Sequence, residues 1–156
     1  MEPVQVEEKK FPGEGAVFLN QPVARETALI EGKNKRLYIG THANAVNSWL
    51  VEFDPSRGAG GMKVVVDAHK AIGKDLRGFG SQSKIHSRNN VGPSGKVYFA
   101  TKQGYPTPQE KRTDYPGGYP MVYDPATGKT KVFDIPIKHH GIISVTPDES
   151  RNLAYI

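Results

Sequence analysis

Three stretches of this sequence repeat one local pattern: a strand end, a polar turn containing Gly, Pro or Asp, and an apolar-aromatic strand. They read ALIEGKNKRLYIGTH, NNVGPSGKVYFATKQ and IISVTPDESRNLAYI. With Leu37, Val97 and Leu153 taken as equivalent, the spacings are 60 and 56 residues. A regular spacing of this length predicts an array of similar units, each a small piece of supersecondary structure.

A second pair of matching stretches lies between these three. WLVEFDPSRGAGGMKVVVD and PMVYDPATGKTKVFDIP each read as a strand, an Asp-Pro turn with a downstream glycine, and another strand. The Asp side chain caps such a turn and the proline presets the next φ angle. One repeat therefore contains four strands, which in the second repeat are expected at about 84–91, 96–101, 119–123 and 130–135.

Four-stranded units at this spacing, with no helix between them, predict an all-β chain and indicate the blades of a β-propeller. A two-sheet sandwich is the structural alternative. The 156 residues hold about two four-stranded blades plus the start of a third, so we expect part of a six- to eight-bladed propeller. Exposed strand edges would then cause low solubility or self-association. The expected divisions are an N-terminal segment 1–22, blade 1 at 23–68, blade 2 at 84–137 with a long loop 102–120, and the first strands of blade 3 at 138–156.

Composition limits the function classes. With no cysteine, the chain has no disulfide, thiol nucleophile or cysteine metal site. The net charge of +5 is scattered over many turns, which favours a solvated surface over a nucleic-acid patch. No run approaches the ~18 apolar residues of a membrane span. MEPVQVEEKK has no apolar signal core, so if Met1 is the native start the default expectation is a cytoplasmic protein.

The stretch DPATGKTKVFDIPIKHHGIISVTPDESRNLAYI resembles the repeat of the streptogramin (virginiamycin B) lyase-like propellers. That repeat runs Asp-Pro-Ala-Thr-Gly, a strand ending in a proline segment, His-Gly-Ile, a Gly-Pro-Asp-Gly turn and an aromatic strand. SVTPDESRNLAYI is also similar to YVTN-type and gluconolactonase-like propeller repeats. The resemblance implies the fold, whereas propellers of this kind include lyases, lactonases, redox enzymes and binding domains. HSRNN replaces His-Gly-Ile in the second blade, and no catalytic role of the lyases is transferred to a residue here.

Two histidines fall at matching positions when residues are counted from the strand ends. Five residues before Val91 is His86, five before Val145 is His140, and five before Ile30 is Arg25. Propeller geometry would place these side chains at the start of each innermost strand, at the mouth of the central channel. Imidazole can serve there as a metal ligand or as an acid-base group near neutral pH. The alternative is a polar ring that hydrogen-bonds backbone groups between blades.

The same face is expected to collect further polar groups. His42 and Lys102 follow the second strand of blades 1 and 2. The loop KQGYPTPQEKRTDYPGGYP holds Tyr105 and Tyr115 beside prolines, and tyrosines stiffened in this way can form a contact surface for a sugar, an aromatic ligand or a peptide. The alternative is that these tyrosines cover blade edges.

Two functions follow as expectations. The first is a ligand-binding or scaffold domain with its site at the channel mouth, which binds a small molecule, a carbohydrate or a protein. The alternative is a metal-dependent lyase or lactonase-type hydrolase that acts on a small anionic or carbohydrate-like substrate. In the enzyme, His86 and His140 would be ligands or bases, and bound Mg²⁺, Mn²⁺ or Ca²⁺ would polarise a carboxylate or lactone carbonyl. Neither nucleic acid nor a membrane span is expected.

Overall fold

The described part of the chain is mostly antiparallel β-structure. The structure is a computed structural model, and it describes residues 29–42, 48–74, 80–103 and 108–156. The strands are β1 (Leu29–Glu31), β2 (Leu37–Gly40), β3 (Trp49–Phe53), β4 (Met62–Asp67), β5 (Asn90–Val91), β6 (Val97–Ala100), β7 (Pro120–Asp124), β8 (Lys129–Val132), β9 (Thr146–Asp148) and β10 (Leu153–Tyr155).

These strands form three sheets, each with its strands in chain order. The first has the order β1-β2-β3-β4, the second has the order β5-β6-β7-β8, and β9 pairs with β10. Every pair inside these sheets is antiparallel. The expected mostly-β chain with four-stranded antiparallel units is confirmed. None of the sheets closes on itself in the described residues.

Both Asp-Pro segments form the turns that the sequence predicts. Asp54 accepts hydrogen bonds from the backbone N–H of Ser56 (3.1 Å) and from its hydroxyl (2.6 Å), and Arg36 contacts the same carboxylate at 2.7 Å. Asp124 accepts a hydrogen bond from the N–H of Ala126 at 2.9 Å. Each aspartate therefore fixes the connection from the third to the fourth strand of its sheet.

A short helix, α1 (Ala68–Ile72), follows β4 and differs from the expectation of a repeat without helices. The Asp67 carboxylate caps its N-terminus by accepting from the N–H of Lys70 at 3.0 Å, and Gly73 ends it with φ 67°. Aspartate at the N-cap and glycine in the left-handed region are the usual signals for helix ends. They occur in DAHKAIG, which can therefore form a helix of only five residues.

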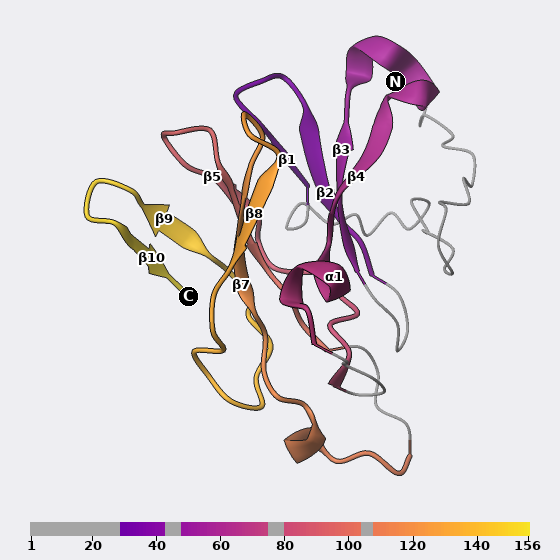
Figure 1. Cartoon of the computed structure of the whole chain (residues 1–156), viewed down its shortest axis with the longest axis vertical. Coiled ribbons are helices and arrows are strands. Elements are labelled where there is room, and N and C mark those ends of the chain that lie inside the picture. The colour runs from indigo at the N-terminus through magenta and orange to yellow at the C-terminus, as the bar shows by residue number, and fades with distance from the viewer. Residues whose placement is uncertain (1–28, 43–47, 75–79, 104–107) are drawn as a thin grey trace, which may run out of the picture.

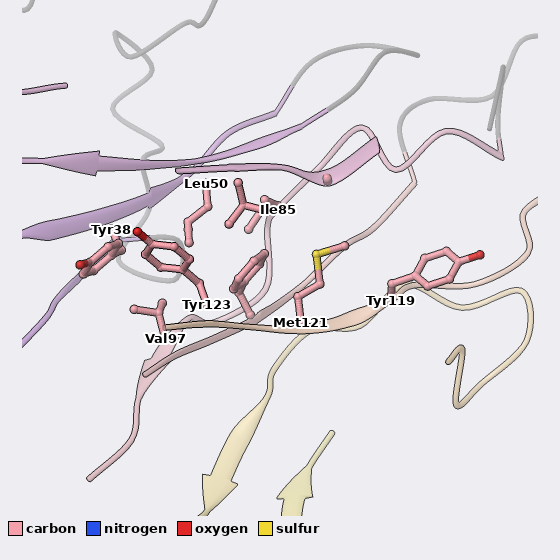
Figure 2. Close-up of a cluster of buried hydrophobic side chains, with 10 residues drawn as sticks. Tyr38, Leu50, Ile85, Val97, Tyr119, Met121 and Tyr123 are labelled. Carbon is pink, nitrogen blue, oxygen red and sulfur yellow. The ribbon is translucent and has the colours of Figure 1, made fainter. Parts of the chain in front are cut away.

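The two four-stranded sheets pack face to face on one hydrophobic core. Figure 2 shows this layer, in which side chains from β2 and β3 meet side chains from β6 and β7. The rings of Tyr38 and Tyr123 lie with centroids 6.0 Å apart across the interface. The buried members are Tyr38, Leu50, Val66, Ala68, Ile85, Val97, Phe99, Tyr119, Met121 and Tyr123.

The β9–β10 hairpin packs on the other face of the second sheet. Ile142 and Val145, which precede β9, form a smaller buried cluster with Ala100 of β6, and the half-buried Tyr98 ring packs against it. In Figure 1 the yellow hairpin lies beside the second sheet, on the side away from β1–β4. Each unit therefore packs on the unit that precedes it in the sequence.

The first turns of the three units also touch one another in series. Lys33, in the β1–β2 turn, donates a hydrogen bond from Nζ to the carbonyl of Pro93 in the β5–β6 turn. Glu149, in the β9–β10 turn, accepts from the N–H of Ser94 at 2.7 Å and from the Tyr98 hydroxyl at 2.8 Å. Partial burial opposes ionisation of Glu149, but these hydrogen bonds outweigh it and lower the pKa of the carboxyl.

The third of these turns is one residue shorter than the first two. The N–H of Lys35, Gly95 and Asn152 donates to the carbonyl of Gly32, Gly92 and Glu149, respectively, and all three donors have positive φ. Leu37 pairs with Glu31 and Val97 pairs with Val91, in each case six residues apart, whereas Leu153 pairs with Asp148, five residues apart.

Candidate functional site

Three polar side chains form a row across three chain segments at one end of the sheets. Lys84 lies between the segment after β2 and the segment after β6: it is directly opposite His42 on one side and Lys102 on the other, both antiparallel. Residues directly opposite each other in antiparallel segments project their side chains to the same face. His42, Lys84 and Lys102 are therefore neighbours, although 60 residues separate the first from the last.

Backbone hydrogen bonds fix the central segment of this row. The N–H of Lys84 donates to the carbonyl of Lys102 at 3.0 Å, and the N–H of Lys102 donates back to Lys84 at 2.7 Å. On the opposite edge the N–H of Ile85 donates to the carbonyl of Thr41 at 2.9 Å. Ile85 is buried beside Gly40, where a Cβ would overlap the Ile85 backbone. The segment that carries Lys84 is therefore hydrogen-bonded to a neighbouring segment on each side.

His86 extends the row by one side chain. Ile85 and Ser87 are buried whereas Lys84 and His86 are only half-buried, and this alternation is typical of an extended segment. Lys84 and His86 therefore project to the same side. His86 was expected at this end of the molecule from the sequence. Lys84 was not selected, although it begins the expected strand 84–91.

The Lys84 ammonium lies in an environment that disfavours its charge. Partial burial, and then the positive charge of Lys102, lower the pKa of Lys84 below its usual 10.5. Desolvation and a like charge both destabilise an ammonium. A bound anion would favour the charged form and thereby offset both effects. The row is thus electrostatically suited to an anionic group.

Gly141 places the His140 segment against the end of this row. A Cβ on Gly141 would overlap Cγ of Lys102 and would lie 2.7 Å from Oε1 of Gln103. The absence of a side chain lets the Lys102 stem lie directly on this glycine. His140 itself is exposed, and its Nδ1 is 2.8 Å from the carbonyl of Lys138. Because Gly141 packs on Lys102, the preceding residue His140 lies at the edge of the row.

The matching positions proposed for His86 and His140 are not equivalent in the structure. The N–H of Ile85 donates to Thr41, and the N–H of Ile142 makes the corresponding bond to Thr101 at 3.4 Å. Ile142 is thus the counterpart of Ile85, so that Ile143 corresponds to His86 and Ser83 corresponds to His140. The count from Val145 was wrong because Asp148, not Val145, takes the position of Val91 before the third turn.

Tyr115 lies inside the protein rather than on an exposed contact surface. Its hydroxyl donates to Oε1 of Gln82 at 3.1 Å, and burial strongly raises the pKa of the phenol. Nε2 of Gln82 donates to the carbonyl of Gly117 at 3.1 Å, and the Gln82 carbonyl accepts from the Ser48 hydroxyl at 2.6 Å. Tyr115 and Gln82 therefore join the loop after β6 to the first sheet, close in sequence to Lys84.

Arg25 and Tyr105, the other expected ligand-binding residues, lie outside the described residues. Within the described ranges no group of three or more His, Asp or Glu side chains is arranged to hold a metal ion. No helix in that part of the chain is long and apolar enough to cross a bilayer.

Comparisons with protein-family models, with curated proteins and with solved structures gave no match.

Proposed function

We propose that this chain is part of a β-propeller whose function is to bind a small anionic ligand at the row formed by His42, Lys84, His86 and Lys102. The observation that carries the proposal is the direct juxtaposition of Lys84 with Lys102 on one side and His42 on the other. Two ammonium groups and two imidazoles on a fixed backbone suit a carboxylate or phosphate group. A ligand of this class gains charge-assisted hydrogen bonds from several directions.

The serial arrangement of the units supports the propeller part of the proposal. Two four-stranded meanders pack face to face, and a third hairpin packs on the second meander. Their first turns touch in the same order through Lys33 and Glu149. Units that repeat their contacts in this way are typical of radial β-architectures. The row then lies at the ends where the innermost strands begin.

The metal-dependent lyase or lactonase-type hydrolase is the alternative proposal. It depends on His86 and His140, which do not hold equivalent positions in their units. The ligand-binding proposal uses His86 without a metal. We therefore favour binding of an anion over metal-assisted chemistry.

Calorimetric titration of the whole chain tests the proposal, with inorganic phosphate and citrate as probes at constant ionic strength. We expect saturable binding that Lys84→Met weakens about ten-fold, because one charge-assisted contact is lost. Lys129→Met, which removes an exposed lysine of β8, should leave binding unchanged. Equal effects of the two substitutions, or no saturable binding of either probe, would overturn the proposal.

A further inference from the structure

We propose that Lys84 forms an imine with the carbonyl group of a small oxo-acid whose carboxylate is bound at the row. This inference rests on the proposed anion site and names its ligand class, an acid with a carbonyl next to the carboxylate. The geometry behind it is the position of Lys84, which lies directly between Lys102 on one side and His42 on the other. These neighbours supply an ammonium that binds a carboxylate and an imidazole that transfers protons.

The Lys84 amine is attached to a fixed point of the backbone. Lys84 and Lys102 exchange both backbone hydrogen bonds, at 3.0 and 2.7 Å, and opposite residues of this kind have Cα atoms about 5.5 Å apart. On the other side the N–H of Ile85 donates to the carbonyl of Thr41 at 2.9 Å. The two lysine side chains therefore start close together on one face. A carboxylate held by Lys102 would place the adjacent carbonyl carbon beside Lys84.

The surroundings of Lys84 favour the unprotonated amine that the reaction needs. The side chain is half-buried, and this burial, together with the positive charge of Lys102, lowers the pKa of Lys84 below its usual 10.5. Desolvation and a neighbouring cation are the influences that activate a lysine as a nucleophile. Lys129 of β8, by contrast, is exposed to solvent. Lys84 should therefore react with a carbonyl compound faster than Lys129.

The reaction replaces the carbonyl C=O bond by a C=N bond without any oxidation or reduction. The lone pair of Lys84 Nζ bonds to the carbonyl carbon, while the π electrons of the C=O bond move to the oxygen. Nζ then gives up both of its protons, which leave with the carbonyl oxygen as water when the C=N bond forms. The imidazole of His42, directly opposite Lys84, can carry these protons from nitrogen to oxygen near neutral pH.

Imine formation would make the row selective among small acids. A protonated imine keeps the positive charge of Lys84, so the product retains its attraction to the ligand carboxylate. An acid without a carbonyl group, such as lactate, would gain the ionic contacts alone. Oxo-acids should therefore bind more tightly than hydroxy-acids of the same size.

Reductive trapping in the full chain tests this chemistry. Sodium cyanoborohydride reduces an imine to a stable amine, and peptide mass spectrometry locates the adduct. With pyruvate at neutral pH, we expect the adduct to form more than about ten-fold faster at Lys84 than at Lys129, because each unit of lowered pKa raises the fraction of free amine about ten-fold. Inorganic phosphate should slow the reaction at Lys84 alone. Equal rates at the two lysines, or no effect of phosphate, would overturn the proposal.

Two substitutions separate imine formation from anion binding. Lys84→Arg keeps a positive charge without a nucleophilic amine, so it should lose the fast adduct and bind pyruvate no more tightly than lactate in calorimetry. Lys102→Met removes the partner of the carboxylate and should slow trapping at Lys84 about ten-fold. Lys129→Met is the matched control and should leave the rate at Lys84 unchanged.

The outcomes distinguish this inference from the proposed function. Saturable phosphate binding that Lys84→Met weakens, without faster trapping of pyruvate at Lys84 than at Lys129, would overturn the imine and leave the anion site standing. Pyruvate that binds Lys84→Arg more tightly than lactate does would also overturn the imine. An absence of saturable phosphate and citrate binding would overturn the proposed function itself.

Discussion

Lys84 and Lys102 exchange both of their backbone hydrogen bonds, at 3.0 and 2.7 Å, so two positively charged side chains project from one face of adjacent segments. Like charges directly opposite each other destabilise a sheet. The lowered pKa of Lys84 records part of that effect. An anion between the two ammonium groups would turn the repulsion into two attractions. This relationship is the basis of the proposed function.

Replacing Lys84 should separate ligand affinity from folding. Lys84→Met keeps the apolar stem and removes the charge, so anion affinity should fall about ten-fold while the melting temperature stays within about 3 °C or rises. Calorimetry and thermal unfolding measure the two quantities. A large loss of stability in Lys84→Met would show that the lysine serves the fold.

The pH dependence of binding should follow Lys84. Its pKa is lowered, so the ammonium loses its proton below the usual 10.5, and anion affinity should fall as the pH is raised through this lowered pKa. The fold disfavours the protonated form, so the free energy of unfolding should rise over the same pH range. Lys84→Arg stays protonated and should bind at higher pH than the original chain. If the two proteins have the same pH profile, Lys84 is not the titrating group.

Gly141 should be required for the position of Lys102. Gly141→Ala introduces a Cβ that overlaps the Lys102 stem, so we expect a loss of about 1–3 kcal/mol in the free energy of unfolding, together with weaker anion binding. The matched control is Gly60→Ala, because a Cβ on Gly60 meets nothing within 4 Å. Chemical denaturation of both variants checks the difference. Similar stabilities would contradict the close packing of Gly141 on Lys102.

Acid should loosen the contact between the second and third units. The pKa of Glu149 is lowered, so its stabilising contribution is complete above the usual 4.5 and is lost as the pH falls through the lowered value. Glu149→Gln should cost about 1 kcal/mol at neutral pH and should reduce the acid sensitivity of the melting temperature. Glu31→Gln, which removes only an exposed ion pair with Lys35, is the control and should change little. An unchanged acid profile in Glu149→Gln would contradict the role of Glu149.

The sequence was sufficient to predict the two central strands of the second unit, because its turns have local chemical signals, whereas of the strand expected at 84–91 only β5 (Asn90–Val91) forms. The strand expected at 96–101 contains β6, and that expected at 119–123 overlaps β7 (Pro120–Asp124). Asp54 and Asp124 cap their turns through their own side chains, which is a property of neighbouring residues. Helix α1 was not predicted, because a five-residue helix has too little periodicity to show in a sequence.

The candidate site could be predicted only in part. His42 and Lys102 follow corresponding strands, so their shared end of the molecule was expected from the order of the strands. Lys84 was missed because its importance comes from pairing with two segments that are distant in the sequence. The equivalence of His86 and His140 was wrong because Asp148, a polar residue, takes the position that Val91 holds before the preceding turn. Residue type alone could not reveal that shift of three residues.

The most direct test of the account is an NMR titration of the whole chain with citrate, and then with inorganic phosphate, at constant ionic strength. We expect saturable shifts of the backbone amides of Lys84, Lys102 and His42 with one common dissociation constant, and no comparable shift at Lys129 or Lys131. Uniform small shifts at all lysines, or an absence of shifts at Lys84 and Lys102, would contradict an anion site at this row.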